Sequence, residues 1–238
     1  MKLSIISRAG AFILCSLVLS SCRYINWAMD QLPQTPKVCY DEMTVRRYMR
    51  SLHLYDQFDT LAHFEVLWLS DEVRSVYAQV YADKHGLSDE RFEEFERRQL
   101  EENNHYISFY VLIATPEASD SALGEKCSTW TIYMKIDCDI YHPVEIKQVE
   151  LCPEYELFFG WRMSRFKTPY IIRFDAQDID ENDLIDASTK TVELWFRKAD
   201  RVEKVRWYLT QEGKAISEPA KECNGLAYDI KPLETGVF

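Results

Sequence analysis

The chain has 238 residues, and its 47% hydrophobic and 13% aromatic content is enough to bury the core of one large domain. The formal net charge of −11 predicts repulsion of nucleic-acid phosphates and argues against nucleic-acid binding. Glycine is scarce, at seven residues, and neither the GxGxxG nor the GxxxxGK phosphate-binding pattern occurs, so we expect no cofactor.

The first 22 residues are typical of an export signal. Lys2 and Arg8 make the start basic, residues 11–19 are apolar, and two serines precede Cys22. The apolar run is much shorter than the ~20 residues that a membrane-spanning helix needs. An ordinary secretory signal fits the basic start and the apolar run, but a Cys directly after Leu-Ser-Ser favours a lipoprotein.

This pattern resembles the signal peptide and lipobox of bacterial lipoproteins. The resemblance covers residues 1–22. It implies that residues 1–21 are removed as a signal peptide and that Cys22 carries the lipid, with palmitate among its acyl chains. Two or three acyl chains give stable anchoring, whereas one alone binds only marginally. Residue 23 is Arg rather than the Asp that marks retention in the inner membrane. The resemblance therefore implies the periplasmic face of the outer membrane in a Gram-negative host.

The charge of the mature chain bears on how it is held at a membrane. Removal of Lys2 and Arg8 with the signal changes the net charge from −11 to about −13. Such a chain repels anionic headgroups, so we expect the lipid to be the whole membrane anchor. Residues 22–36 contain two prolines that break regular structure and are predicted to be a flexible tether. A single domain is expected over residues 37–238.

The first elements of this domain are predicted from the spacing of apolar residues. A short helix is expected over residues 41–52, followed by a strand over 58–68, where apolar side chains alternate. Ser70 is expected to cap a helix whose apolar residues recur at i, i+3 and i+4, and Gly86 to end it. A second helix comes next, so residues 70–103 are predicted to form an αα-hairpin inserted between strands.

Strands dominate after the hairpin. Residues 106–114 are a continuous apolar run, which is typical of a strand buried on both faces. Five further strands are predicted over residues 129–137, 144–151, 170–174, 191–196 and 204–209. Together with the strand before the hairpin, they predict a mainly β fold with a helical insertion, namely a β-sandwich of about seven strands.

Five cysteines come after the lipobox, and export would permit disulfides. If the two strands after Cys127 form an antiparallel hairpin, Cys152 returns toward Cys127, which predicts a bridge between them. Cys39 and Cys223 flank the domain, whose ends often lie close together, and are a second candidate pair. The alternative is that these cysteines are buried free thiols.

One acidic loop resembles the start of an EF-hand calcium site. Its oxygen-bearing residues at positions 1, 3, 5 and 9 are Asp178, Asp180, Asn182 and Asp186. Position 6 is Asp183 instead of Gly, and position 12 is Thr189 instead of Glu. The favoured interpretation is therefore an acidic connection between two strands, and no metal site is assigned.

Two smaller clusters have simpler interpretations than catalysis or metal binding. His63 and Glu65 share one face of a strand, but no zinc-binding motif accompanies them, so a surface strand pair is expected. Cys138, Asp139 and His142 lie within one turn, and packing or disulfide use is favoured because two zinc-ligand types do not make a site. The GxSxG motif of serine hydrolases is absent from the sequence.

The sequence favours a membrane-anchored envelope lipoprotein with a structural or protein-interaction role and without catalysis. An exported hydrolase that attacks envelope polymers through carboxylates, and a periplasmic carrier of an apolar ligand, remain as alternatives. If the protein is a hydrolase, we expect carboxylates that converge in a cleft. If it is a carrier, we expect an apolar cavity of about 300 Å³ or more. If it has an interaction role, we expect an exposed apolar or aromatic patch. Core packing does not account for four aromatic residues, which are candidates for such a patch: Tyr55, Tyr133, Tyr155 and Trp161.

Overall fold

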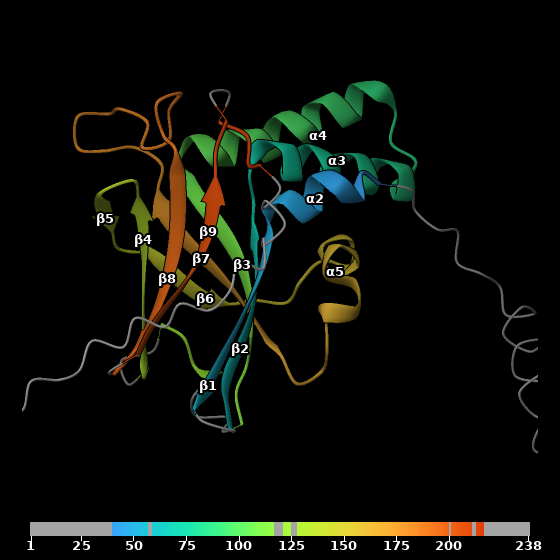
Figure 1. Ribbon diagram of the computed structural model, residues 1–238. Helices are drawn as coiled ribbons and strands as arrows, with labels where there is room; N and C mark the ends of the chain where they lie inside the picture. The colour runs from blue at the N-terminus through green and yellow to red at the C-terminus, as the bar shows by residue number, and fades with distance from the viewer. Residues whose placement is uncertain are drawn as a thin grey trace, which may run out of the picture. The chain divides into compact units, whose positions relative to one another are not determined.

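The computed structural model describes residues 40–56, 59–116, 121–124, 128–199, 201–210 and 213–216, and its strands form two antiparallel sheets (Figure 1). The strands are β1 (Met49–Asp56), β2 (Asp59–Trp68), β3 (Tyr106–Ala114), β4 (Trp130–Ile136), β5 (Asp139–Tyr141), β6 (Glu145–Gln148), β7 (Thr168–Asp175), β8 (Thr191–Lys198) and β9 (Arg201–Tyr208). One sheet has the order β1-β2-β3-β7-β6 and the other β5-β4-β8-β9. The predicted mainly β sandwich with helical insertions is therefore confirmed.

The helices are α2 (Glu42–Tyr48), α3 (Asp71–His85), α4 (Asp89–Glu101) and α5 (Pro153–Phe159), with short 3-10 turns η1 (Glu102–Asn104) and η3 (Gly160–Arg162). Within the described part of the chain, none of them is long and apolar enough to cross a membrane.

The core lies between the two sheets, because alternate side chains of each strand point inward. On β2, Phe64 stacks on Phe196 of β8 with ring centroids 4.3 Å apart, and it meets Trp130 of β4 at 5.1 Å. Trp68 meets Trp207 of β9 at 5.7 Å. All five rings are buried, and each contributes on the order of 2–3 kcal/mol of hydrophobic stabilisation.

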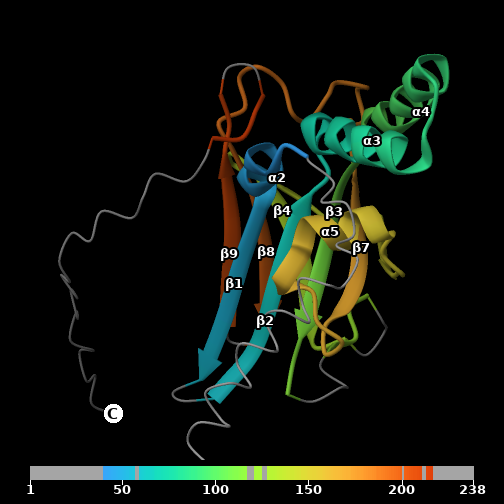
Figure 2. The ribbon, with the colours of Figure 1, turned by 90° about the vertical axis from the view of Figure 1, so that its right-hand side faces the viewer.

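Helices cover the opposite face of the five-stranded sheet, as Figure 2 shows for α3 and α5. Tyr155 of α5 stacks on Tyr77 of α3 at 4.3 Å between centroids and meets Tyr110 of β3 at 4.8 Å. Tyr155 is buried, so packing explains this residue and it forms no part of an exposed patch.

The predicted αα-hairpin is present as α3 and α4, and it joins the paired strands β2 and β3. Ser70 caps α3 by accepting a hydrogen bond from the backbone N–H of Val73 at 3.4 Å, and Gly86 ends it in the left-handed conformation with φ 61°. α4 has no buried residue and lies at the outside of the molecule (Figure 1). Buried Arg74 ties α3 to the η1 turn after α4, since its guanidinium reaches Asn103 at 2.6 Å and Glu102 at 2.8 Å.

Side chains close the gap between the edge strands β1 and β9. The Arg50 guanidinium donates to the carbonyl of Arg206 at 2.9 Å, and the Trp207 indole N–H donates to the carbonyl of Tyr48 at 3.0 Å. These bonds satisfy backbone oxygens that an open edge would leave unpaired.

Several predicted boundaries were wrong. The helix predicted over residues 41–52 ends at Tyr48, and β1 begins at Met49. The strand predicted over residues 144–151 is present only as β6, and α5 comes after it. Proline at the first position of α5 suits a helix start, where its missing N–H has no cost.

The predicted hairpin of residues 129–137 with 144–151 is also wrong. β4 pairs with β5 and β8, whereas β6 pairs with β7 in the other sheet. The cause is a tight turn at Asp137, which has φ 48° and accepts hydrogen bonds from the backbone N–H groups of Lys190 and Thr191. The chain makes a short hairpin there and then crosses to the five-stranded sheet.

Candidate functional site

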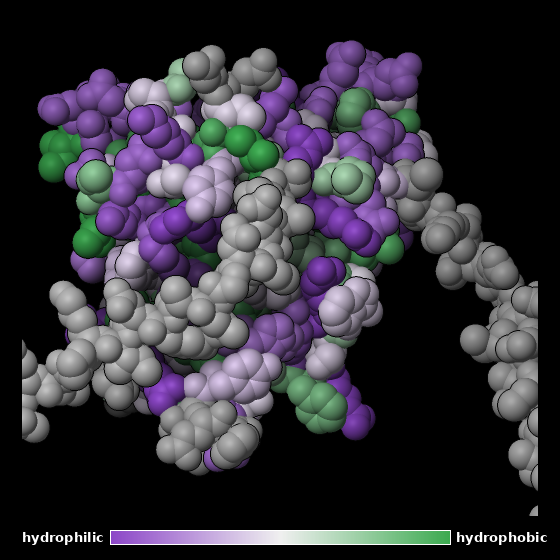
Figure 3. All heavy atoms as spheres, viewed as in Figure 1, coloured by the Kyte–Doolittle hydropathy of each residue, from purple (hydrophilic) through white to green (hydrophobic). Residues whose placement is uncertain are grey.

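Two large aromatic side chains are almost fully exposed on the short segment between α5 and β7. Trp161 is 83% exposed and Phe166 is 73% exposed. Gly160, with φ 52°, ends α5 and lets the chain turn into this segment. Hereafter residues 160–167 are called the aromatic segment. Most of the visible surface in Figure 3 is hydrophilic, with hydrophobic residues in small separate patches.

Local hydrogen bonds give the aromatic segment a defined backbone. The N–H of Met163 donates to the carbonyl of Gly160 at 3.0 Å, and the N–H of Lys167 donates to the carbonyl of Ser164 at 3.0 Å. The Ser164 hydroxyl accepts from the N–H of Phe166 at 3.2 Å. The exposed rings are therefore presented on an ordered turn.

Every charged side chain of the aromatic segment is a cation, although the whole chain has a net charge of −11. The Arg162 guanidinium lies 4.8 Å from the centre of the Trp161 ring, and that of Arg165 lies 4.8 Å from the centre of the Phe166 ring. Such cation–π contacts hold the rings and cations side by side. Leu157 of α5 adds a further partly exposed apolar side chain.

A buried carboxylate fastens this segment to the sheet. Glu65 of β2 is only 1% exposed. One of its oxygens lies 3.3 Å from the Lys167 ammonium, and the other lies 3.5 Å from Nε of Arg162. The Ser51 hydroxyl of β1 also donates to it. Because a buried carboxylate needs compensating charge, these contacts hold Arg162 and Lys167 against β2.

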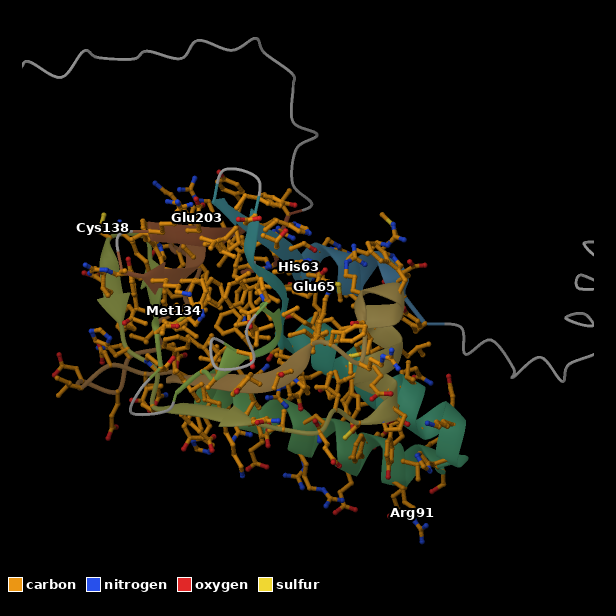
Figure 4. All side chains as sticks on the ribbon, turned by 90° about the horizontal axis from the view of Figure 1, so that it is seen from below. His63, Glu65, Arg91, Met134, Cys138 and Glu203 are labelled. Atoms are coloured by element: carbon orange, nitrogen blue, oxygen red, sulfur yellow. The ribbon has the colours of Figure 1, made fainter. Side chains whose placement is uncertain are left out.

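His63 completes this cluster, which comprises Ser51, His63, Glu65, Arg162 and Lys167 and is hereafter called the Glu65 cluster. The Nε2 atom of His63 lies 2.9 Å from the Glu65 carboxylate. The His63 ring stacks on the His53 ring, with 3.8 Å between their centroids. Burial lowers the pKa of His63, and the Lys167 ammonium lowers it further, against the opposing effect of Glu65. Figure 4 shows His63 and Glu65 side by side.

The expectation of a surface strand pair at His63 and Glu65 was therefore wrong for Glu65. Strand periodicity placed both residues on one face, but α5 and the aromatic segment cover that face. The order of groups also differs from a serine-hydrolase relay, because the Ser51 hydroxyl donates to the carboxylate and not to the imidazole.

Ser164 and Lys167 have the Ser-x-x-Lys spacing of another hydrolase class, which the sequence interpretation missed. Their contacts do not form a nucleophile–base pair. The Lys167 ammonium is held by Glu65, and the Ser164 hydroxyl accepts from a backbone N–H of its own turn. Ser164 and Lys167 thus both serve to hold the aromatic segment in place, Ser164 within the turn and Lys167 against Glu65.

A second buried carboxylate, Glu193, lies on the outer face of the four-stranded sheet. It accepts hydrogen bonds from Lys204 at 3.0 Å, from the Trp195 indole at 2.8 Å and from Arg206. Burial by itself raises the pKa of Glu193, but the hydrogen bonds outweigh this effect and the pKa is below its ordinary value. Tyr133 stacks on Trp195 at 5.5 Å, and the Lys204 ammonium lies 4.4 Å from the centre of the Trp195 ring. Trp195 thus contacts its register neighbours on both adjacent strands, β4 and β9.

A pocket of about 350 Å³ lies beside the first turn of α3. Its carboxylates are already engaged: Asp71 accepts from Asn103 at 2.6 Å, and Glu72 accepts from the Tyr48 hydroxyl at 3.0 Å. Asp183 accepts from Gln177 at 3.1 Å. The lining mixes polar and apolar groups, unlike the apolar cavity that a carrier of an apolar ligand needs.

The acidic loop resembling an EF-hand lies between β7 and β8. The Asp178 carboxylate accepts from the backbone N–H groups of Asp180 and Asn182, at 2.8 and 2.9 Å. Asp186 accepts in the same way from Ser188 and Thr189. These oxygens stabilise turns, and the described residues contain no group of three or more His, Cys, Asp or Glu side chains that could hold a metal ion.

The predicted disulfides fall partly outside the described residues. Cys22, Cys39, Cys127 and Cys223 all lie there. The thiol of Cys152 is free and exposed in the structure. The strand pairing that suggested a Cys127–Cys152 bridge does not occur, so its geometric basis is lost. The pairing of Cys39 with Cys223 stays a prediction.

The remaining sequence candidates are scattered. Cys138 is an exposed free thiol in the turn between β4 and β5, and Asp139 and His142 are exposed beside it. Tyr55 is exposed near the end of β1. Of the four aromatic candidates for a binding surface, Trp161 is the one that the structure places on a segment with a second highly exposed ring. Phe166 was missed, although its place in the basic and aromatic run Trp-Arg-Met-Ser-Arg-Phe-Lys is a readable signal.

Comparisons with known proteins add little. No protein-family model matches the chain, and no curated protein matches it. A crystal structure of Hcp1 from Salmonella typhimurium is similar over 70% of this chain and 80% of that chain, with 9% sequence identity and a TM-score of 0.14. That likeness is too weak to carry an argument about fold or function.

Proposed function

We propose that this protein is a membrane-anchored envelope lipoprotein that acts by binding, in a structural or protein-interaction role, rather than by catalysis. Lipid on Cys22 would hold it at the membrane, at the periplasmic face of the outer membrane in a Gram-negative host. The single observation that carries the binding role is the aromatic segment, with Trp161 at 83% and Phe166 at 73% exposure.

Exposed rings of this kind favour binding for a physical reason. Leaving an aromatic side chain in water forgoes roughly 2–3 kcal/mol of hydrophobic stabilisation, which a partner that covers the ring recovers. Trp and Arg are also the residue types most enriched at the energetic centres of protein interfaces. A segment with two exposed rings and three cations is therefore suited to a partner surface.

The fastening by Glu65 supports the same role. Ordering a mobile loop on binding costs free energy, and a segment that is already fixed avoids most of that cost. The Glu65 cluster fixes Arg162 and Lys167, one near each end of the segment. Trp161 and Phe166, each next to one of these cations in the sequence, are thus presented in advance, as a binding surface requires.

Photo-cross-linking in the native envelope tests the binding role. A photoreactive phenylalanine analogue replaces Trp161, and a matched control places it at Arg91, an exposed residue of α4 that lies away from the Glu65 cluster (Figure 4). We expect adducts from position 161, counted with lipid and with protein together, to be at least about tenfold more abundant than from position 91. Equal yields at the two positions would mean that the aromatic segment faces only water.

A further inference from the structure

We infer that the aromatic segment binds the anionic surface of the lipid bilayer itself. The inference rests on the proposed lipid anchor and names the partner of the same surface. The lipid at Cys22 would tether the chain, and Trp161 and Phe166 would seat the domain on the bilayer in one orientation.

The position of Tyr40 is the first argument. Tyr40 begins the described domain, and it contacts α5 directly: its ring lies 5.1 Å from that of Phe158, and its hydroxyl lies 3.5 Å from the carbonyl of Leu157. The described chain therefore begins beside Leu157 of α5, one helical turn before Trp161. Its first residue packs on the helix that leads directly into the aromatic segment.

The length of the connection to Cys22 is the second argument. Tyr40 comes eighteen positions after Cys22, and a fully extended chain over this distance spans at most about 60 Å. A tether of such reach keeps the domain near the bilayer but does not orient it. Contacts made by the domain itself are needed to fix an orientation.

The chemistry of the segment is the third argument. Tryptophan is enriched where proteins meet the membrane–water interface, because its ring is apolar and its N–H is polar. Arginine and lysine next to a bilayer are attracted to anionic headgroups. The segment carries Trp161, Phe166 and exposed Arg165 within six residues, together with Arg162 and Lys167.

The net charge of the mature chain, about −13, does not oppose this contact. Screening in salt limits the reach of surface charge to about 8–10 Å, so the headgroups respond to the segment's own cations. Glu65, the acid that contacts Arg162 and Lys167, is buried and paired with them. The expectation that the lipid is the whole membrane anchor, drawn from net charge alone, is replaced by an anchor with two parts.

Tryptophan quenching in vesicles tests the inference. The full-length lipidated protein is reconstituted into vesicles of phosphatidylethanolamine and phosphatidylglycerol whose acyl chains are brominated, and the fluorescence lost is compared between wild type and Trp161→Phe. The chain has six tryptophans, and the difference between the two proteins isolates Trp161. We expect at least half of the Trp161 emission to be quenched. Emission that brominated lipid leaves unchanged would overturn the inference.

Charge variants sharpen the test. Arg165→Ala is expected to lower the ratio of docked to undocked protein about fivefold in the same vesicles, whereas Arg91→Ala on α4 leaves it unchanged. Replacing phosphatidylglycerol with phosphatidylcholine should abolish the difference between these variants. Equal effects of the two substitutions would contradict binding to anionic headgroups.

The failures of the two proposals are distinguishable. If labelled palmitate is absent from Cys22 in cells, the anchor fails, while unlipidated protein added to the same vesicles still reports on the segment through quenching of Trp161. If palmitate is present and Trp161 is not quenched, only the bilayer contact fails. A protein adduct at position 161 in the envelope would overturn the bilayer as partner and leave the binding role standing.

Discussion

Replacing Glu65 with glutamine should destabilise the domain, because it removes the charge at the centre of the Glu65 cluster and keeps the size of the side chain. Breaking a fully buried ion pair from one side costs about 3–5 kcal/mol. Here the side chain of Lys167 is 9% exposed and that of Arg162 is 27% exposed, so water compensates part of the loss. We expect the free energy of unfolding to fall by about 2–4 kcal/mol.

Urea denaturation measures this loss. With a slope near 2 kcal/mol per molar urea, the midpoint should fall by about 1–2 M at an unchanged slope. Glu203→Gln on β9 is the matched control, since Glu203 is exposed (Figure 4), and its midpoint should stay within about 0.2 M of wild type. Trypsin should also cleave Glu65→Gln faster after Arg165, because the aromatic segment loses its fastening. A Glu65→Gln midpoint equal to that of the control would refute the account of the cluster.

Three further substitutions test other parts of the structure. Glu193→Gln should lower the free energy of unfolding by about 2–3 kcal/mol. Folding holds the pKa of Glu193 below its ordinary 4.5, so this stabilisation is complete above about pH 4.5 and is lost as the pH falls through the folded pKa. When unfolding is followed against pH, the stabilities of wild type and variant should therefore converge in acid. Ser70→Ala should lower the free energy of unfolding by about 1 kcal/mol, whereas Ser88→Ala should change it by less than half as much, because Ser88 makes no side-chain cap bond. Equal losses of unfolding free energy for the two variants in urea denaturation would contradict this. Gly160→Ala should cost about 1–2 kcal/mol through its φ of 52°, although a Cβ there meets no atom within 4 Å, and an unchanged melting temperature would show that this backbone conformation is not required.

Elements with strong local signals were predictable from the sequence. β4 alternates buried and less buried residues, and β3 is almost entirely apolar because it is the central strand of its sheet. The start and end of α3 follow from Ser70 and Gly86. β1 was missed because the apolar spacing of the preceding helix continues into it, and only tertiary pairing with β2 ends the helix.

The candidate site depends on contacts that local patterns do not encode. The Glu65 cluster joins Ser51 of β1, Glu65 of β2 and Lys167 after η3, which lie up to 116 positions apart. Alternation indicated that Glu65 faces away from the core but not that another segment covers it. Trp161 was singled out because packing did not explain it, which is the sequence signal of an exposed ring.

Labelling with palmitate in the native host tests the central claim most directly. Wild-type protein should incorporate labelled palmitate and fractionate with membranes, and Cys22→Ala should be unlabelled and remain uncleaved at this position. Label on the Cys22→Ala protein, or wild-type protein without label, would contradict a lipid anchor at Cys22.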